Sequence, residues 1–317
     1  MYAGNQMTTS IKPKKHLFQA QMEDKGKRLD AFIAEKLNIS KAVGRRLIMI
    51  GSVYLNKKRI HIASKSIFEG SHIEVFYNPT LVKTDPPFEL KQTDILYEDD
   101  VLIFVNKPTH FPTQPTLDDS RNNLFKELKR YLDKRDKKDS YVGLHHRLDK
   151  DTSGVIVFTK SKDVNKKLAE SFQERSLIKK YLALTEKSPY FTFSEGEVFT
   201  IKNHLKKTPG KKAKMLSVRS GGDYAHTDFK VLQILQDSYL IESTLHTGRM
   251  HQIRAHLSEK GVPVCGDLHY GAKEKKSRIF LHAHSLELIH PLTGQPLKVE
   301  SPVPVDFKKC LNSSKTF

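Results

Sequence analysis

The sequence predicts a two-domain protein that combines α-helices with antiparallel β-strands, and three patterns support this prediction. Residues 27–77 contain two segments with apolar residues at helical spacing, followed by short β-type runs. Residues 78–92 contain three prolines and little apolar pattern, which is typical of a linker. Residues 196–245 alternate apolar and polar residues between turn clusters, which is typical of antiparallel strands. We therefore expect a polar tail at 1–20, a small domain at 21–82, a linker at 83–92, a large domain at 93–310 and a second tail at 311–317.

The composition favours a protein that binds a polyanion. The 317 residues include 54 Lys and Arg against 36 Asp and Glu, which gives a net charge of +18. Nucleic acid is the first candidate partner and an anionic membrane the second, while a merely solvated lysine-rich surface is the alternative. No apolar run approaches the roughly 18 residues of a membrane helix, and residues 1–15 lack the apolar segment of a secretion signal. Two cysteines imply no disulfide framework, so we expect a cytoplasmic protein without a membrane partner.

The small domain shows a compact helical and strand pattern with a basic face. Leu29, Phe32, Ile33 and Leu37 share one helical face, and Ser40 is a candidate cap for a second helix. Two short strand-like runs at 53–55 and 60–62 flank residues 56–59, which we interpret as a basic hairpin tip. The domain is either a nucleic-acid-binding module or a small capping domain with a solvated surface. The basic face would consist of Lys41, Arg45, Arg46, Lys57, Lys58 and Arg59.

The large domain alternates strand-like and helix-like segments. A turn at 98–100 separates two strands, and Pro108 ends the second strand. The other elements that we expect are a basic helix at 124–132, a charged loop at 134–138, a strand at 155–158, a helix after Ser161, a strand at 179–184, a basic loop at 202–214, and a helix that begins near Gly248 and ends at Gly261.

Residues 145–154, with the sequence His-His-Arg-Leu-Asp-Lys-Asp-Thr-Ser-Gly, are the strongest candidate for a functional site. They form a polar loop that leads directly into the apolar run 155–158. Loops held by a rigid strand often place catalytic groups, and a carboxylate beside cations stays ionised and oriented. The same residue types also form ordinary turns, because Asp, Thr and Ser side chains bond their own backbone. Composition alone favours the turn interpretation.

The order of the residues in this stretch is informative. His146-Arg147-Leu148-Asp149-x-x-Thr152-Ser153-Gly154 resembles the signature of the RluA family of RNA pseudouridine synthases, in which the Asp of the Arg-Leu-Asp triplet is catalytic. Further segments resemble the other motifs of this family in the same order. They are Ile95–Pro108, where His110 replaces the usual Gly of the continuation, Lys179–Leu184, Leu245–Leu257, Gly266–Gly271 and Leu281–Ala283.

The small domain resembles the α-L RNA-binding motif named for a ribosomal protein. The similar positions are Arg28-Leu29-Asp30, Ser40-Lys41, Ile50-Gly51-x-Val53 and Leu55-Asn56. The motif usually has Gly after that Asn, whereas this chain has Lys57, which adds positive charge at the turn.

Together, these resemblances imply an α+β fold. They imply a pseudouridine synthase catalytic domain with a mixed, largely antiparallel sheet and a central cleft, beside a small α-L RNA-binding domain. They further imply isomerisation of uridine in structured RNA through base flipping, without a cofactor or a metal. Asp149 would act as a nucleophile or as a base; the sequence leaves both open. Arg249 would orient Asp149, with Arg254 as the weaker candidate, and Tyr181 would complete the catalytic set. The substrate-binding residues would be Arg147, His146, Leu281, Arg254, Lys57 and Arg45.

Several alternatives to this interpretation stay open. We expect ribosomal RNA of the large subunit as substrate, with transfer RNA as the alternative, and a monomeric enzyme. A non-catalytic ribosome-binding or RNA-binding protein, or a hydrolase that releases uracil, would also fit the charge and the carboxylate. A metal site is not expected, because the closest approach to a ligand pattern is the pair His282-x-His284.

Overall fold

The computed structural model describes residues 14–49, 51–77, 88–115, 122–210 and 213–313, and they form two compact units that divide between Pro87 and Phe88. The three prolines of the expected linker lie outside the described residues. The expectation that the linker continues to residue 92 is wrong, because Phe88 and Leu90 pack against the second unit. Leu90 is 3% exposed, and the Phe88 ring lies 5.0 Å from the ring of Phe111.

The first unit is a small four-stranded sheet with two helices. Its core contains the apolar residues of both helices and of the two central strands. The sheet has the order β1-β4-β2-β3, and the paired strands are antiparallel. Its elements are β1 (Lys14–Gln19), α1 (Leu29–Leu37), α2 (Lys41–Met49), β2 (Val53–Leu55), β3 (Lys58–Arg59) and β4 (His72–Tyr77).

Strand β1 corrects the expected polar tail at residues 1–20. Lys14–Gln19 pairs along its whole length with β4, and residues 1–13 lie outside the described residues. His16 and Phe18 alternate with exposed neighbours, and the Phe18 ring packs edge-on against Phe32 at 6.2 Å. The prediction of a polar tail was wrong because the alternation of partly buried and exposed residues in β1 is short and follows two lysines.

The helix predicted from Leu29 to Leu37 is confirmed as α1, but the basic hairpin is tighter than expected. Asn56 and Lys57 alone form the turn, with φ angles of +49° and +64°. Two consecutive left-handed residues are typical of the tight turn that joins antiparallel strands. Lys57 therefore adopts the left-handed backbone that Gly would adopt at the same position. Residues 60–62 do not form the expected strand.

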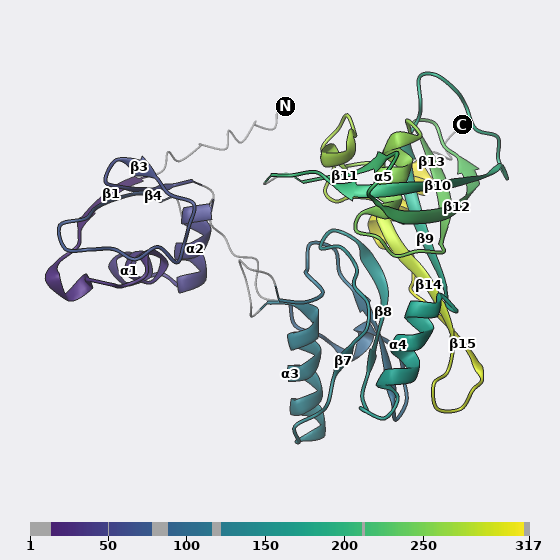
Figure 1. Cartoon of the computed structure of the whole chain (residues 1–317), viewed down its shortest axis with the longest axis horizontal. Helices are drawn as coiled ribbons and strands as arrows, with labels where there is room; N and C mark the ends of the chain where they lie inside the picture. The colour runs from purple at the N-terminus through teal and green to yellow at the C-terminus, as the bar shows by residue number, and fades with distance from the viewer. Residues whose placement is uncertain (1–13, 50, 78–87, 116–121, 211–212, 314–317) are drawn as a thin grey trace, which may run out of the picture. The chain divides into compact units, whose positions relative to one another are not determined.

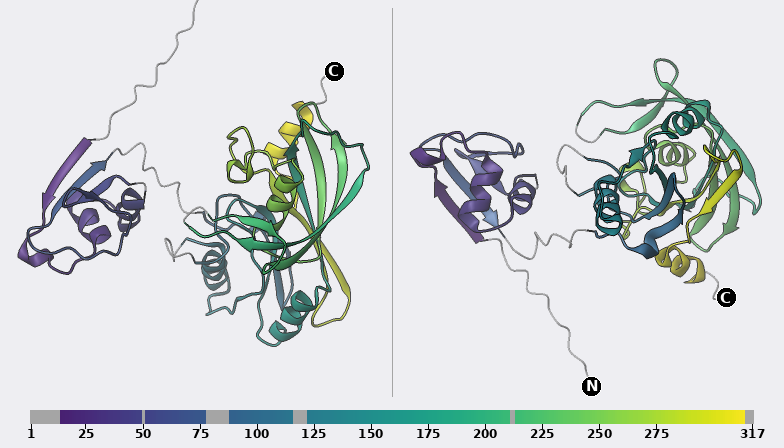
Figure 2. Two further views of the ribbon diagram at one scale, coloured as in Figure 1. Left: turned by 45° about the horizontal axis from the view of Figure 1, so that its top comes forward. Right: turned by 90° about the horizontal axis from the view of Figure 1, so that it is seen from below.

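The second unit contains one large, twisted sheet, which Figures 1 and 2 show from three sides. Its strand order is β11-β10-β12-β13-β9-β14-β8-β6-β5, with β15 added to β14 and β7 added to β8. Among the described strands, only β8 and β14 pair in parallel. The strands are β5 (Ile95–Glu98), β6 (Leu102–Lys107), β7 (Gly143–Leu144), β8 (Ser153–Thr159), β9 (Ile178–Glu186), β10 (Val198–Lys207), β11 (Met215–Val218), β12 (Asp223–Ile234), β13 (Ser238–Leu245), β14 (Leu281–Ile289) and β15 (Pro296–Glu300).

The helices divide between the two ends of this sheet. In Figure 1, α3 (Leu124–Asp136) and α4 (Asn165–Glu174) lie beside the β8 end, and α5 (Gln252–Glu259) lies at the β10–β13 end. Each end has its own apolar core, and Tyr181 on β9 packs against both. The mixed, largely antiparallel sheet with flanking helices confirms the predicted α+β class. It also confirms the antiparallel strands predicted for residues 196–245. The expected basic loop at 202–214 is wrong in its first half, because residues 202–207 belong to strand β10.

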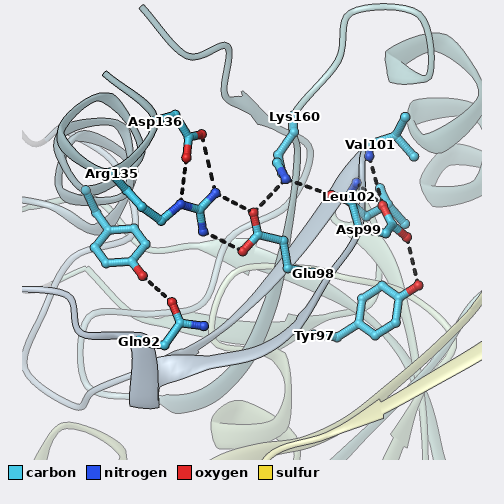
Figure 3. A network of polar contacts seen from close by, with 10 residues as sticks. Gln92, Tyr97, Glu98, Asp99, Val101, Leu102, Arg135, Asp136 and Lys160 are labelled. Carbon is cyan, nitrogen blue, oxygen red and sulfur yellow. Dashed lines mark hydrogen bonds and ion pairs between the residues drawn. The ribbon is translucent and has the colours of Figure 1, made fainter. Parts of the chain in front are cut away.

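Helix α3 is longer than expected because a partly exposed ion pair holds its last turn. The predicted charged loop at 134–138 is wrong up to residue 136, since α3 continues to Asp136. Both terminal nitrogens of Arg135 lie 2.7 Å from the carboxylate oxygens of Glu98, and Lys160 reaches the same carboxylate at 2.6 Å (Figure 3). Arg135 lowers the pKa of Glu98, so the carboxylate is ionised at neutral pH.

Replacing Glu98 by Gln is expected to lower the free energy of unfolding by about 1–3 kcal/mol at pH 7, because Arg135 and Lys160 lose their charged partner. Since the folded pKa of Glu98 is depressed, its contribution is present above the unfolded pKa of about 4.3 and is lost as the pH falls through the folded value. Urea unfolding at pH 7 and at about pH 3 measures the difference, with exposed Glu195→Gln as the control. An equal loss at both pH values would contradict this account.

The chain closes on α6 (Val305–Ser313), which corrects the expected tail at 311–317 in part. Phe307 on this helix is completely buried against the second core, and residues 314–317 lie outside the described residues. Among the described residues, none of the helices has both the length and the apolar character that crossing a membrane requires.

Candidate active site

The loop from His145 to Thr152 runs between β7 and β8 and is held by a second loop that follows β6. The backbone N–H of Thr152 donates to the carbonyl of Asp149 at 3.1 Å, so the stretch also contains a turn. The Thr113 hydroxyl donates to the carbonyl of Leu148 at 2.8 Å, and the Thr109 hydroxyl donates to the carbonyl of Asp151 at 2.8 Å. These contacts fix the backbone on both sides of Asp149.

Lys107, at the end of β6, supports the same loop from the interior of the domain. Its side chain is completely buried at the end of β6, and its ammonium donates to the carbonyls of Pro108, Phe111 and Lys150 at 2.7–3.1 Å. Burial lowers the pKa of Lys107 to about 7, while the charges of Asp151 and Asp149 oppose this shift. All three N–H donors of the ammonium are thereby used on backbone, which ties the two loops together.

His110 stands where the related motif has Gly, and it keeps the backbone that Gly would adopt. Its φ is +60°, a left-handed value that His tolerates better than most residues. The ring adds two contacts that Gly lacks, with Asp151 Oδ1 at 2.9 Å and with the carbonyl of Ser277 at 3.0 Å. His110 therefore adds side-chain contacts to the loop that a Gly could not make.

The loop also depends on Gly154, where β8 begins its parallel pairing with β14. A Cβ atom at this position would lie 2.1 Å from the carbonyl oxygen of Ala283, and φ is +116°. Only Gly allows the two strands to approach this closely. Gly154 therefore brings the end of the loop against the strand that starts at Leu281.

Asp149 lies partly exposed, with 28% of its side chain accessible, and the buried Arg254 and the partly buried His251 approach one of its oxygens. Arg254 Nη1 lies 3.6 Å from Asp149 Oδ2, and His251 Nε2 lies 3.8 Å from the same atom. Among the described residues, Oδ1 of Asp149 has no hydrogen bond or ion pair. Within the described residues, the contacts of the carboxylate are therefore confined to Oδ2.

Arg254 itself is fixed by a buried carboxylate and an aromatic ring. Its Nε and Nη2 form two hydrogen bonds to Asp267 at 2.6 and 2.9 Å, and its guanidinium lies 4.9 Å from the ring centre of Tyr270. Arg254 is 5% exposed and Asp267 is 1% exposed. A paired, planar guanidinium of this kind is a rigid support for a second carboxylate.

Arg249, the expected orienting cation, does not contact Asp149. Its Nε donates to the carbonyl of Tyr224 at 3.0 Å, and its nearest carboxylate is that of Asp223 at 3.9 Å. Arg249 precedes α5, whereas Arg254 lies inside the helix on its buried side. The structure therefore reverses the predicted order of the two arginines.

Tyr181 and Leu281 lie on adjacent strands next to this group. Tyr181 pairs with Ala283, and Leu281 pairs with Ala183, so the two residues are diagonal neighbours on β9 and β14. Burial raises the pKa of Tyr181, and the charge of Asp149 raises it further. Leu281 is 3% exposed and belongs to the apolar core.

The other predicted substrate contacts are His146 and Arg147 on the second unit, and Lys57 and Arg45 on the first unit. His146 accepts a hydrogen bond from the N–H of Val157 at 3.1 Å and stacks on Phe172 at 4.7 Å, and burial lowers its pKa to about 3. This neutral, engaged ring argues against a role in substrate binding. Arg147 is exposed. Lys57 is exposed on the first unit, and Arg45 there pairs with the buried Asp30 at 3.4 Å.

Three residues on β12 and the end of β13 bring potential metal ligands together. His226, Asp228 and His246 place one ligand atom each within 4.8 Å of the others. The two rings stack at 4.0 Å with an angle of 18°, and they contact different oxygens of Asp228 at 3.3 and 2.6 Å. Parallel rings direct their nitrogens side by side, whereas a metal ion requires them to converge. We therefore do not assign a metal to this group, and the metal-free reaction stays a prediction.

Sequence reasoning missed Lys107, His251, Asp267 and Tyr270 as parts of this arrangement. All four lie in the segments that resemble family motifs, which was the available signal, but their contacts join residues far apart in the chain. Arg254 and Asp267 are separated by 13 residues, and Lys107 and Lys150 by 43. No periodicity or local spacing predicts such pairs.

Comparison with known proteins agrees with this geometry. Residues 101–259 match the RNA pseudouridylate synthase family. The chain is 31% identical to ribosomal large subunit pseudouridine synthase C of Buchnera aphidicola subsp. Schizaphis graminum, over 90% of this chain and 93% of the relative. It is 33% identical to ribosomal large subunit pseudouridine synthase D of Neisseria meningitidis serogroup A, over 92% and 79% of the two chains.

A solved structure is similar as well. Human RNA Pseudouridylate Synthase Domain Containing 4 aligns with a TM-score of 0.56 and 26% identity, over 69% of this chain and 92% of that protein. Residues 101–259, which match the RNA pseudouridylate synthase family, include Asp149, Tyr181 and Arg254. This chain therefore belongs to the RNA pseudouridylate synthase family and is an RNA pseudouridine synthase of the RluA type.

Proposed function

We propose that this enzyme converts specific uridines of large-subunit ribosomal RNA to pseudouridine, with Asp149 as the catalytic residue. The observation that carries the proposal is the one-sided support of Asp149, in which Arg254 and His251 reach Oδ2 and leave Oδ1 for the nucleoside. The choice of RNA rests on the relatives, which are named for the large ribosomal subunit. We expect the enzyme to act as a cytoplasmic monomer without a cofactor.

The reaction requires little beyond a positioned carboxylate and a pocket for uracil. The bond between N1 and C1′ breaks, the ring turns, and a bond forms between C5 and C1′. C5 then loses its proton and N1 gains one, so the product is an isomer of uridine. Oδ1 of Asp149 either attacks the sugar or the base, or removes a proton from the sugar. Arg254 would keep the carboxylate oriented during these steps, since its own position is fixed by Asp267.

Tyr181, Leu281 and Arg147 would bind the flipped nucleotide. A buried phenol whose pKa is raised stays protonated, so Tyr181 offers a flat, neutral ring for stacking on uracil. Leu281, diagonal to it, would pack against the same base. Extrusion of a stacked base costs a few kcal/mol, and the exposed Arg147 would occupy the vacated space in the RNA.

The test uses RNA that carries tritium at uridine C5, prepared from cells that lack this gene. Release of tritium from large-subunit ribosomal RNA, and not from transfer RNA, is the expected result. Release from transfer RNA alone would overturn the ribosomal assignment. Binding without release from either RNA would indicate a non-catalytic RNA-binding protein, and free uracil in place of pseudouridine would indicate a hydrolase.

We further propose that the first unit binds RNA through the turn between β2 and β3. Asn56 to Arg59 are all exposed at this turn, and Lys57 and Lys58 project positive charge from a rigid hairpin. Arg46 on α2 is exposed as well. Arg45 contributes less to this surface than expected, because Asp30 neutralises part of its charge.

Replacing Lys57 and Lys58 together by Glu is expected to weaken RNA binding and to reduce the slope of log affinity against log salt by roughly one to two, since each phosphate contact releases counterions. Filter binding over a range of salt concentrations measures both quantities. The control is Lys134→Glu with Lys138→Glu, which makes the same charge change at exposed positions of the second unit. Equal effects of the two pairs would leave only a general charge effect and would contradict a binding surface at the turn.

A further inference from the structure

A histidine next to Asp149 has its two ring nitrogens in different surroundings. His251 Nε2 lies 3.8 Å from Asp149 Oδ2, and His251 Nδ1 lies 3.0 Å from the hydroxyl oxygen of Tyr270. Burial lowers the pKa of His251 despite the opposing charge of Asp149, so the ring is neutral at pH 7. A neutral imidazole carries its proton on one nitrogen only. The position of that proton decides whether His251 can donate a hydrogen bond to Asp149.

Tyr270 determines the position of this proton. The backbone N–H of Met215 donates to the Tyr270 oxygen at 2.8 Å, which leaves the hydroxyl hydrogen of Tyr270 for His251 Nδ1. An Nδ1 that accepts a hydrogen bond is unprotonated, and the proton then lies on Nε2. Tyr270 is 3% exposed, and its ring is packed against Arg254, so its phenol oxygen stays in place beside His251.

We infer that His251 is a positioning residue that donates its Nε2–H to Oδ2 of Asp149, and that the Tyr270 hydroxyl fixes the tautomer that makes this possible. The inference rests on the proposed function, in which Asp149 is catalytic. Arg254 and His251 would hold the same oxygen from two directions, which fixes the plane of the carboxylate as well as its position. The distance of 3.8 Å would shorten in the complex with RNA, since catalytic hydrogen bonds often tighten when substrate binds.

The backbone of His251 makes the test selective. His251 has a φ of +53°, a left-handed conformation that Asn adopts more readily than Gln. The amide nitrogen of Gln can reach the position of Nε2, whereas that of Asn reaches only the position of Nδ1. A purely structural role therefore predicts that His251→Asn is the milder change. A donor role toward Asp149 predicts that His251→Gln is the milder change.

The experiment measures kcat and KM for tritium release from C5-labelled RNA with the full-length protein. His251→Gln is expected to stay within a few-fold of the parent in kcat. His251→Asn is expected to lose roughly tenfold to a hundredfold in kcat, the equivalent of one hydrogen bond to a charged group, with unchanged KM. If the Asn variant equals or exceeds the Gln variant, the inference is overturned.

The tautomer gives a second readout, independent of turnover. In protein labelled with nitrogen-15 at histidine, the signal of His251 is identified by its loss in the His251→Gln variant. It is expected to show protonated Nε2 in the parent and a mixture of tautomers in Tyr270→Phe, which removes the hydroxyl and keeps the ring under Arg254. Protonated Nδ1 in the parent would overturn the inference.

A parallel assay of Asp149→Asn distinguishes a failure of the inference about His251 from a failure of the proposed function. If Asp149→Asn is inactive while both His251 variants have parental kcat, the inference fails and the proposed function stands. If Asp149→Asn is active, the proposed function fails and the inference fails with it.

Discussion

Replacing Arg254 by Gln is expected to reduce turnover by roughly a hundredfold or more, whereas Arg249→Gln is expected to cost less than about tenfold. Arg254 is the cation beside Asp149, at 3.6 Å, and a carboxylate displaced by about 1 Å from its reactive position can lose two orders of magnitude in rate. Arg249 is bonded to the carbonyl of Tyr224 on β12 and does not reach the carboxylate. Tritium release from C5-labelled RNA, measured at saturating RNA, compares the two variants.

Stability requires its own control, because Arg254→Gln leaves the buried Asp267 without its partner, a change that can cost about 3–5 kcal/mol. The double variant Arg254→Gln with Asp267→Asn removes that unpaired charge and still removes the cation. We expect the double variant to recover stability in urea unfolding but not turnover. Recovery of turnover together with stability would show that Arg254 acts only through folding. A larger loss from Arg249→Gln would restore the order predicted from the sequence.

The two arginines illustrate what the sequence can and cannot determine about the site. Both lie in one motif, five residues apart, and both follow a strand that ends at Leu245. The start of α5 at Gln252 separates them, because Arg254 lies among the buried residues of the helix, whereas Arg249 precedes it and bonds the carbonyl of Tyr224 on β12. Helix boundaries are the part of a sequence interpretation that is least certain. The resemblance therefore named Arg249 as the orienting cation, whereas the structure places Arg254 beside Asp149.

The fold was predictable where a pattern is long or strongly periodic. The helix at Leu29–Leu37 and the strands of residues 196–245 follow from apolar spacing alone. Strand β1 was missed because only two of its residues, His16 and Phe18, face the interior. The last turn of α3 was missed because it depends on the ion pair between Arg135 and Glu98, which are 37 residues apart. Long-range pairing of this kind leaves no local trace in the sequence.

The support of the catalytic loop was also beyond the sequence. Lys107 lies in a segment that resembles a family motif, but its three carbonyl partners are visible only when the loops are assembled. His146 was expected to contact the substrate, whereas the structure shows its ring stacked on Phe172 and bonded to the N–H of Val157.

Replacing Asp149 by Asn is expected to abolish turnover and to leave RNA binding nearly unchanged. The amide keeps the shape of the side chain but is a poor nucleophile and a poor base, so it can neither attack the nucleoside nor remove a proton from the sugar. The change also removes the charge that Arg254 holds. Binding should persist because the net charge of +18 and the exposed lysines of the first unit do not depend on Asp149.

The most direct test of the account is therefore tritium release by Asp149→Asn from C5-labelled ribosomal RNA, with filter binding on the same protein as the control for an intact fold. The account predicts release below detection together with parental affinity. Release near the parental rate would contradict it, because the carboxylate between Arg254 and His251 would then not be the group that isomerises uridine.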